Sequence, residues 1–162
     1  NLEELVERSW KNFKSVEPRT VRTEPRPEPQ TQPVLSEEQE LLALGQRLIK
    51  AGSWAEADRA LTKANQLDLA DPIILACLGW ARLNNPEMEE QDRIDEGVEF
   101  MILGEQFGPK EIQGLIYLVK GLEIQGRLDA AFDRASRVRK LDPDNAEIQH
   151  LYRRLRMAQS PG

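Results

Sequence analysis

The chain has 162 residues, of which 40% are hydrophobic, and a formal net charge of −6, which suits one domain of ordinary size. Residues 1–35 carry six acidic and six basic side chains, residues 36–111 carry sixteen and seven, and residues 112–162 carry six and nine. This balance disfavours nonspecific nucleic-acid binding, because phosphate attraction needs a dominant basic surface. It favours protein partners, or head-to-tail self-association through opposite charges.

Cysteine and histidine occur once each, as Cys77 and His150. A disulfide within one chain and a zinc site of the usual His/Cys type are therefore excluded. No apolar run approaches the roughly 20 residues of a membrane span, so we expect no span and a cytoplasmic location. The chain begins with Asn1 and has no initiator Met, which indicates a fragment of a longer protein.

The first element, residues 1–16, is predicted to be an isolated amphipathic helix. At about 12 residues it would be marginal alone in water, so its apolar face is expected to dock on another surface. That face carries Leu2, Leu5, Val6, Trp10 and Phe13.

Residues 17–35 contain five of the ten prolines and are predicted to be a semi-extended linker. A second interpretation is a proline-rich ligand for an SH3-like groove, but the segment Arg26-Pro27-Glu28-Pro29 has little apolar content to dock.

The composition changes at Ser36, where a new helix is expected to begin. Ser36 is a favourable N-cap residue, and Gln39 stands where it can close a capping box. Helical periodicity then continues, with interruptions, to about Met157.

Residues 38–71 predict a pair of packed helices. Small and large apolar residues form two helical faces, separated by a break at residues 50–53: Leu41, Leu44, Gly45 and Leu48, then Ala57, Leu61 and Ala64. These seven residues match the tetratricopeptide repeat (TPR) pattern, large-x-x-Leu-Gly-x-x-large followed by Ala-x-x-x-large-x-x-Ala, so the segment resembles one TPR unit.

The pattern recurs with the period of that family, about 34 residues. Leu75, Leu78 and Gly79 stand one such period after Leu41, Leu44 and Gly45. The second unit, about residues 72–111, carries six extra residues, because Gly97 follows Gly79 by 18 whereas Ala57 follows Gly45 by 12. The residues from Asn84 to Asp92 predict an enlarged turn or an extended helix start.

The third unit, about residues 112–145, restores the usual spacing, since Ala131 follows Val119 by 12. Three residues depart from the pattern: Val119 replaces the usual Gly, Leu69 replaces a closing Pro, and Arg82 stands at a position that is usually large and apolar. We predict an all-α, TPR-type α-solenoid over residues 36–160, with three repeats and a C-terminal capping helix at 146–157.

The capping helix carries Arg153, Arg154 and Arg156 on one face. Solvated surface is one interpretation of these arginines. The other is a basic patch for an acidic partner, formed together with Arg134, Arg137, Arg139 and Lys140.

The sequence offers no catalytic constellation. His150 has no Ser, Cys or carboxylate in a base-orienting arrangement, and no phosphate loop or dinucleotide motif is present. We therefore expect no enzyme activity, no catalytic residue, no cofactor and no metal.

The TPR resemblance implies that the first helix of each pair lines a concave groove. This lining would be mostly apolar, which suits an amphipathic helix or an apolar peptide of a partner. The predicted groove residues are Leu42, Gln46, Ile49, Ile73, Ala76, Trp80, Leu83, Gln113, Ile116, Tyr117 and Lys120.

TPR co-chaperones grip the terminal carboxylate of heat-shock chaperones with Lys, Asn and Arg in this groove. The matching positions here are Leu42, Gln46, Cys77, Gln113 and Tyr117, so the sequence argues against that function.

Residues 2–13 could occupy the groove of the same or a neighbouring molecule. Two alternatives remain open at this point: these residues are the tail of an upstream domain, or the groove is covered by the chain's own helices. The predicted function is a non-catalytic protein-interaction module within a larger regulatory or assembly protein. The alternative is a small secretion-type chaperone for an exported substrate.

Overall fold

The computed structural model describes residues 1–15 and 34–159, and in the first helix it describes side chains up to residue 8. The chain divides into two compact units, Asn1–Val34 and Leu35–Gly162. Nearly all of the predicted linker, including the segment proposed as an SH3-type ligand, lies outside the described residues.

The first unit contains α1 (Leu2–Ser15), which agrees with the predicted amphipathic helix. Leu2, Leu5 and Val6 are 82%, 66% and 52% exposed. The side chains of Trp10 and Phe13 lie outside those described. The docking of this face therefore stays a prediction.

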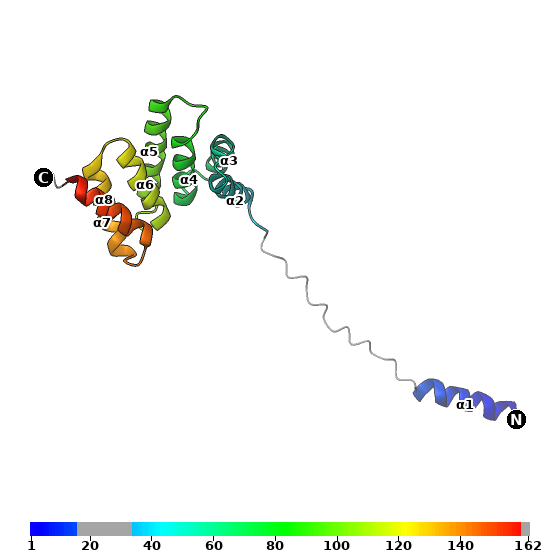
Figure 1. The fold of residues 1–162 in the computed structure, drawn as a ribbon. Coiled ribbons are helices and arrows are strands. Elements are labelled where there is room, and N and C mark those ends of the chain that lie inside the picture. Colours follow the sequence, from blue (N-terminus) through cyan, green and yellow to red (C-terminus); the bar gives the residue numbers. More distant parts are fainter. Residues whose placement is uncertain (16–33, 160–162) are drawn as a thin grey trace. The chain divides into compact units, whose positions relative to one another are not determined.

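The second unit is entirely helical over its described residues, 35–159 (Figure 1). The predicted all-α fold, with three helix pairs and a terminal helix, is confirmed. The helices are α2 (Glu37–Lys50), α3 (Trp54–Leu67), α4 (Pro72–Leu83), α5 (Glu90–Phe107), α6 (Ile112–Ile124), α7 (Leu128–Leu141) and α8 (Ala146–Gln159).

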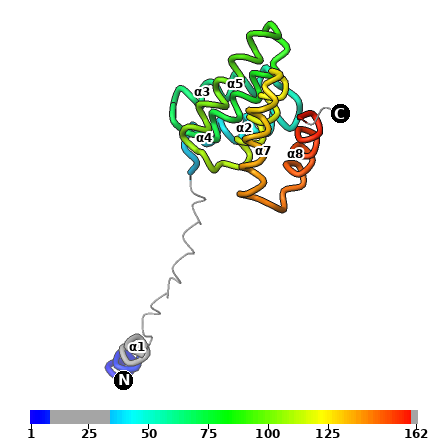
Figure 2. Tube along the Cα trace, turned by 90° about the vertical axis from the view of Figure 1, so that its left-hand side faces the viewer, coloured from blue at the N-terminus to red at the C-terminus, as the bar shows by residue number. Residues whose placement is uncertain are grey.

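Successive helices pack in pairs, α2 with α3, α4 with α5 and α6 with α7, and each pair packs on the next. Figures 1 and 2 both show α7 and α8 side by side at the C-terminal end. A larger core runs through α4 to α8, and a smaller one, which includes Leu61 and Leu78, joins α3 to α4.

The predicted capping box at the start of α2 is present. The Ser36 hydroxyl accepts from the Gln39 backbone N–H at 3.4 Å, and the Gln39 side chain accepts from the Ser36 N–H at 3.2 Å. Helix α4 begins similarly, because Asp71 accepts from two backbone N–H groups and Pro72 occupies the first helical position.

The six extra residues of the second unit enlarge both the turn and the following helix. Three residues separate α2 from α3 and α6 from α7, whereas residues 84–89 separate α4 from α5. Helix α5 has 18 residues, against 14 in each of α3 and α7. The two predicted outcomes of the insertion therefore occur together.

Helices α4 and α5 approach each other closely at two glycines. A Cβ atom on Gly79 would lie 2.5 Å from the Gly97 carbonyl oxygen, and one on Gly97 would lie 2.6 Å from the Gly79 carbonyl oxygen. Because each obstacle is backbone, neither position has room for a side chain.

Arg82, which departs from the repeat pattern, belongs to a polar network between α3 and α4. Its guanidinium donates to Asp58 at 2.9 and 3.2 Å, and the Asn85 amide donates to the same carboxylate at 2.9 Å. Burial alone would raise the pKa of Asp58, but these hydrogen bonds outweigh it and hold the pKa below its usual range. At the position of Arg82, where the repeat pattern usually has a large apolar residue, the structure has a hydrogen-bonded charge pair instead.

Candidate functional site

Helices α2, α4 and α6 open the three helix pairs, and α8 follows the last pair. Helix α4 packs on both α2 and α6, and two ion pairs join α6 to α8, so we call these four helices the inner row. Gln46, Trp80, Lys120 and Arg154 stand at matching places on these four helices. Trp80 follows Gln46 by one repeat period, and Arg154 follows Lys120 by one repeat period. The interval from Trp80 to Lys120 is one period plus the six extra residues of the second unit. We call the surface around these four residues the inner face.

The inner face has an aromatic centre that joins α4 to α6. The rings of Trp80 and Tyr117 stack with centroids 5.2 Å apart and planes inclined by 6°. Trp54, the first residue of α3, meets the Trp80 ring edge-on at 6.4 Å. The Lys120 ammonium lies 5.4 Å from the Trp80 ring centre, within cation–π range. The rings therefore fix each other in place while they remain partly exposed.

A pocket of about 340 Å³ opens beside this aromatic centre, between α4, α6 and α8. Its charged groups are paired with one another: Lys120 with Glu147, and Arg154 with Glu123 at 2.7 Å. The two ion pairs therefore balance these charges within the pocket. It is lined by Trp80, Lys120, Glu123, Ile124, Glu147, His150, Leu151 and Arg154.

Two groups near the inner face have raised pKa values. Burial raises the pKa of the Tyr117 phenol to about 12, with smaller contributions from Cys77 and Glu147. Burial likewise raises the pKa of the Cys77 thiol to about 11. Both groups are therefore neutral at physiological pH, which preserves the apolar character of the face.

Most of the predicted groove residues lie at the surface. Eight of them are exposed or half-buried: Leu42, Gln46, Ile49, Ile73, Trp80, Gln113, Tyr117 and Lys120.

Three predicted groove residues are buried instead. Ala76, Leu83 and Ile116 are 3%, 4% and 1% exposed. They lie on α4 and α6, which have neighbouring helices on both sides and therefore little free surface. These side chains contribute to the core and present no contact area to a partner.

The structure adds Glu147, His150 and Arg154 to the inner face. The repeat period provides a signal for them, because they stand one period after Gln113, Ile116 and Lys120. Extending the period by one more repeat would have identified these positions on the terminal helix.

The structure also adds Trp54 to the aromatic centre. The sequence gives no comparable signal for this residue, because its contact depends on how the turn between α2 and α3 faces α4.

The described residues contain no group of three or more His, Cys, Asp and Glu side chains that could hold a metal ion. Among the described helices, none combines the length and the apolar composition that crossing a bilayer requires.

No protein-family model and no curated protein matches the sequence. Solved structures, in contrast, give clear matches. The first TPR of Spaghetti (RPAP3), bound to the HSP90 peptide SRMEEVD, is 18% identical with a TM-score of 0.65, and the match covers 75% of this chain and 92% of that one.

Two further solved structures have a similar fold. The Sgt2 TPR domain from Aspergillus fumigatus is 14% identical with a TM-score of 0.66, over 79% of this chain and 87% of that one. The Yersinia enterocolitica type III secretion chaperone SycD, in complex with a peptide of the translocator YopD, is 16% identical with a TM-score of 0.60, over 75% and 93%. The protein therefore has a TPR-type fold, as its repeat spacing predicted.

Proposed function

We propose that the protein is a non-catalytic interaction module whose inner face binds an amphipathic helix or apolar peptide of a partner protein. The observation that carries this proposal is the partly exposed Trp80–Tyr117 stack beside an apolar pocket. Fixed aromatic rings offer large contact area at little entropic cost, which is typical of binding hot spots. The pocket would receive one apolar anchor side chain of the ligand.

Two structures of similar fold support the binding of a peptide segment. Spaghetti (RPAP3) was solved with an HSP90 peptide, and SycD with a YopD peptide. The pairing of Lys120 with Glu147 favours an apolar ligand over a terminal carboxylate, because a carboxylate would have to compete with Glu147 for the ammonium. We place the module in a larger cytoplasmic regulatory or assembly protein.

A secretion-type chaperone is the second candidate function, and the similarity to SycD favours it. The two candidates differ in their ligand. A chaperone of this kind would bind a segment of an exported substrate, whereas a regulatory module would bind a permanent component of an intracellular assembly.

Ligand capture with two matched variants tests the binding surface. Ile73 is 37% exposed on the inner row, and Leu103 is 36% exposed on α5, outside that row. We expect Ile73→Glu to lose captured partners, because it places a charge on the apolar face, and we expect Leu103→Glu to retain them. Equal capture by wild type and both variants would refute the inner face as the binding surface.

The synthetic peptide SRMEEVD, found bound to Spaghetti (RPAP3), tests ligand class directly. We expect no measurable binding to this protein at concentrations that saturate Spaghetti. Saturable binding that Lys120→Gln abolishes would show instead that the inner face accepts a terminal carboxylate.

The first helix is proposed as a ligand or plug of the inner face, in the same or a neighbouring molecule. Its tether would give it an effective concentration of the order of millimolar. Hydrogen exchange of the full chain should then show protection around Trp80 and Tyr117 that is lost on deleting residues 1–35. Unchanged hydrogen exchange at both residues would contradict docking of the first helix on the inner face.

A further inference from the structure

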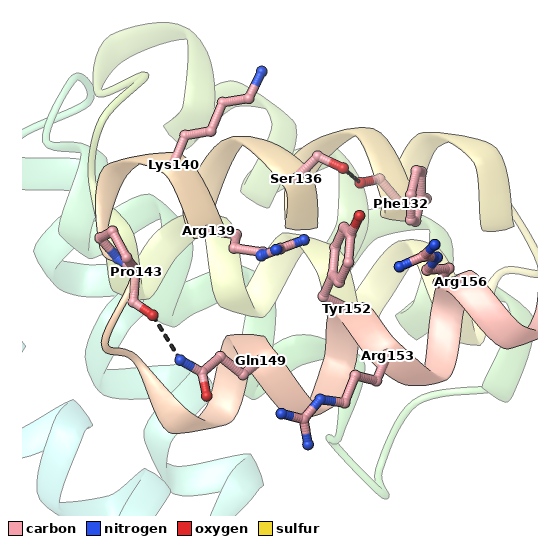
Figure 3. A pocket seen from close by; sticks show the side chains of 9 residues that line it. All are labelled: Phe132, Ser136, Arg139, Lys140, Pro143, Gln149, Tyr152, Arg153 and Arg156. Atoms are coloured by element: carbon pink, nitrogen blue, oxygen red, sulfur yellow. Dashed lines mark hydrogen bonds between the residues drawn. The ribbon is translucent and has the colours of Figure 1, made fainter.

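A second cleft lies between α7 and α8, and it shares no lining residue with the inner-face pocket. Its volume is about 850 Å³. Figure 3 shows its side chains along both helices, with Arg139 and Tyr152 at the centre and Lys140 directed away from them. We call it the basic cleft, and it is lined by Phe132, Ser136, Arg139, Lys140, Pro143, Gln149, Tyr152, Arg153 and Arg156.

Four cations and no carboxylate line the basic cleft: Arg139, Lys140, Arg153 and Arg156. None of the four forms an ion pair with another described residue, and all are exposed.

Neighbouring arginines on the same two helices behave differently. Arg134 and Arg137 both pair with Glu105, at 3.1 and 3.2 Å, and Arg154 pairs with Glu123. The fold therefore neutralises the arginines around the cleft and leaves uncompensated charge inside it.

The floor of the basic cleft is aromatic. Phe132 and Tyr152 stack with centroids 5.2 Å apart, and the Arg139 guanidinium lies 4.3 Å from the Tyr152 ring centre. Figure 3 shows Arg139 reaching towards Tyr152, which restrains its position. A restrained guanidinium loses less entropy when it binds a carboxylate.

Two polar groups of the cleft are already engaged within it. The Ser136 hydroxyl donates to the Phe132 carbonyl oxygen at 2.9 Å, and the Gln149 amide donates to the Pro143 carbonyl oxygen at 2.6 Å. These bonds restrain the side chains of Ser136 and Gln149. The groups left to meet a ligand are the four cations and the exposed parts of the half-buried Phe132 and Tyr152 rings.

We propose that the basic cleft binds an acidic segment of a partner protein that carries an aromatic or apolar side chain. Carboxylates of the segment would pair with the cations, and its aromatic or apolar side chain would pack on Phe132 and Tyr152. A short acidic protein segment is favoured over nucleic acid because the chain carries a net charge of −6, and residues 36–111 would repel a polyanion that extends beyond the cleft.

The test uses the full chain and a fluorescein-labelled decaglutamate peptide with one central tyrosine. We expect saturable binding that weakens with added salt, and no binding of the matched peptide with glutamine in place of glutamate. The double variant Arg153→Gln, Arg156→Gln should lower the affinity roughly tenfold, because two exposed charge contacts are lost.

The control variant Arg47→Gln, Lys63→Gln makes the same change in net charge on α2 and α3, where both residues are exposed and have no ion pair among the described residues. We expect it to bind the peptide like wild type. Equal losses in the two double variants would show a general charge effect and overturn the proposal.

Side-chain amide resonances locate the bound peptide. Gln149 lines the basic cleft, whereas Gln46 and Gln113 lie on the inner face. We expect shifts at Gln149 alone. Shifts at Gln46 or Gln113 instead, or equally tight binding of a ten-nucleotide oligothymidylate, would overturn the proposal. The result of this test for the basic cleft does not depend on whether the inner face binds an apolar peptide.

Discussion

The rings of Trp80 and Tyr117 lie nearly parallel, 5.2 Å apart, and link α4 to α6 on the inner face. One ring comes from the second repeat and the other from the third, so the stack joins two repeats as well as offering surface to a ligand. Stability and ligand binding therefore depend on the same contact, and variants must separate the two.

Trp80→Ala should weaken both properties. It removes the contacts with Trp54, Tyr117 and Lys120, and we expect the free energy of unfolding to fall by about 2 kcal/mol, since the ring is only half-buried. Tyr117→Phe keeps the ring and should leave stability and partner capture close to wild type. Denaturant unfolding and capture assays measure the two effects. A large loss of capture in Tyr117→Phe would instead assign the hydroxyl a direct role in binding.

Cys77 should be unreactive in the folded protein. It is 3% exposed, and burial raises the pKa of its thiol to about 11 from an ordinary value of 9.0. At pH 8 we expect labelling by a thiol-reactive disulfide reagent to be at least about a hundredfold slower than in denaturant. Rapid labelling under native conditions would mean that α4 opens readily and that the inner face is not a fixed surface.

Asp58→Asn should destabilise the protein by roughly 2 to 3 kcal/mol, because it leaves the largely buried Arg82 without its main partner. Glu87→Gln is the control. It breaks the Arg59 ion pair, in which both side chains are more than 60% exposed, and should change stability little. Urea unfolding of the two variants compares the effects. Similar losses of stability in both variants would show that the buried network stabilises the protein no more than the exposed ion pair does.

The same network predicts acid sensitivity. The pKa of Asp58 is lower in the folded protein than its ordinary value of 3.8. Its stabilising contribution is therefore complete above that value and is lost as the pH falls through the lower folded pKa. Unfolding measured from pH 6 down to pH 2 should show a steeper loss for wild type than for Asp58→Asn. Parallel curves would assign the acid sensitivity to other carboxylates.

Gly97→Ala should cost about 2 kcal/mol, because the new methyl group would meet the Gly79 carbonyl oxygen at 2.6 Å and force α4 and α5 apart. Gly114→Ala is the matched control. Its nearest neighbour would be the Ala76 Cβ at 3.2 Å, and the gain in helix propensity offsets that contact, so stability should stay within about 1 kcal/mol of wild type. Thermal unfolding distinguishes the two. Equal stabilities would show that the α4–α5 interface can widen freely.

The helices and their pairing could be predicted from the sequence. The repeat period, the small residues at helix crossings and the Ser36 capping box depend on local spacing and short-range hydrogen bonds. For the same reason, the sequence located the insertion between Gly79 and Gly97 and placed Trp80 and Tyr117 on the inner row.

Which side chains of that row reach solvent depends on the packing of helices that are distant in the sequence. Ala76, Leu83 and Ile116 share the predicted inner positions but are buried, because burial depends on how closely neighbouring helices pack. The sequence pattern likewise does not predict which charged side chains form ion pairs. Arg134 pairs with Glu105, whereas Arg139 lies in an open cleft with no ion pair among the described residues. Glu105 and Arg134 are 29 positions apart in the sequence, so only the packing of one repeat on the next brings them together.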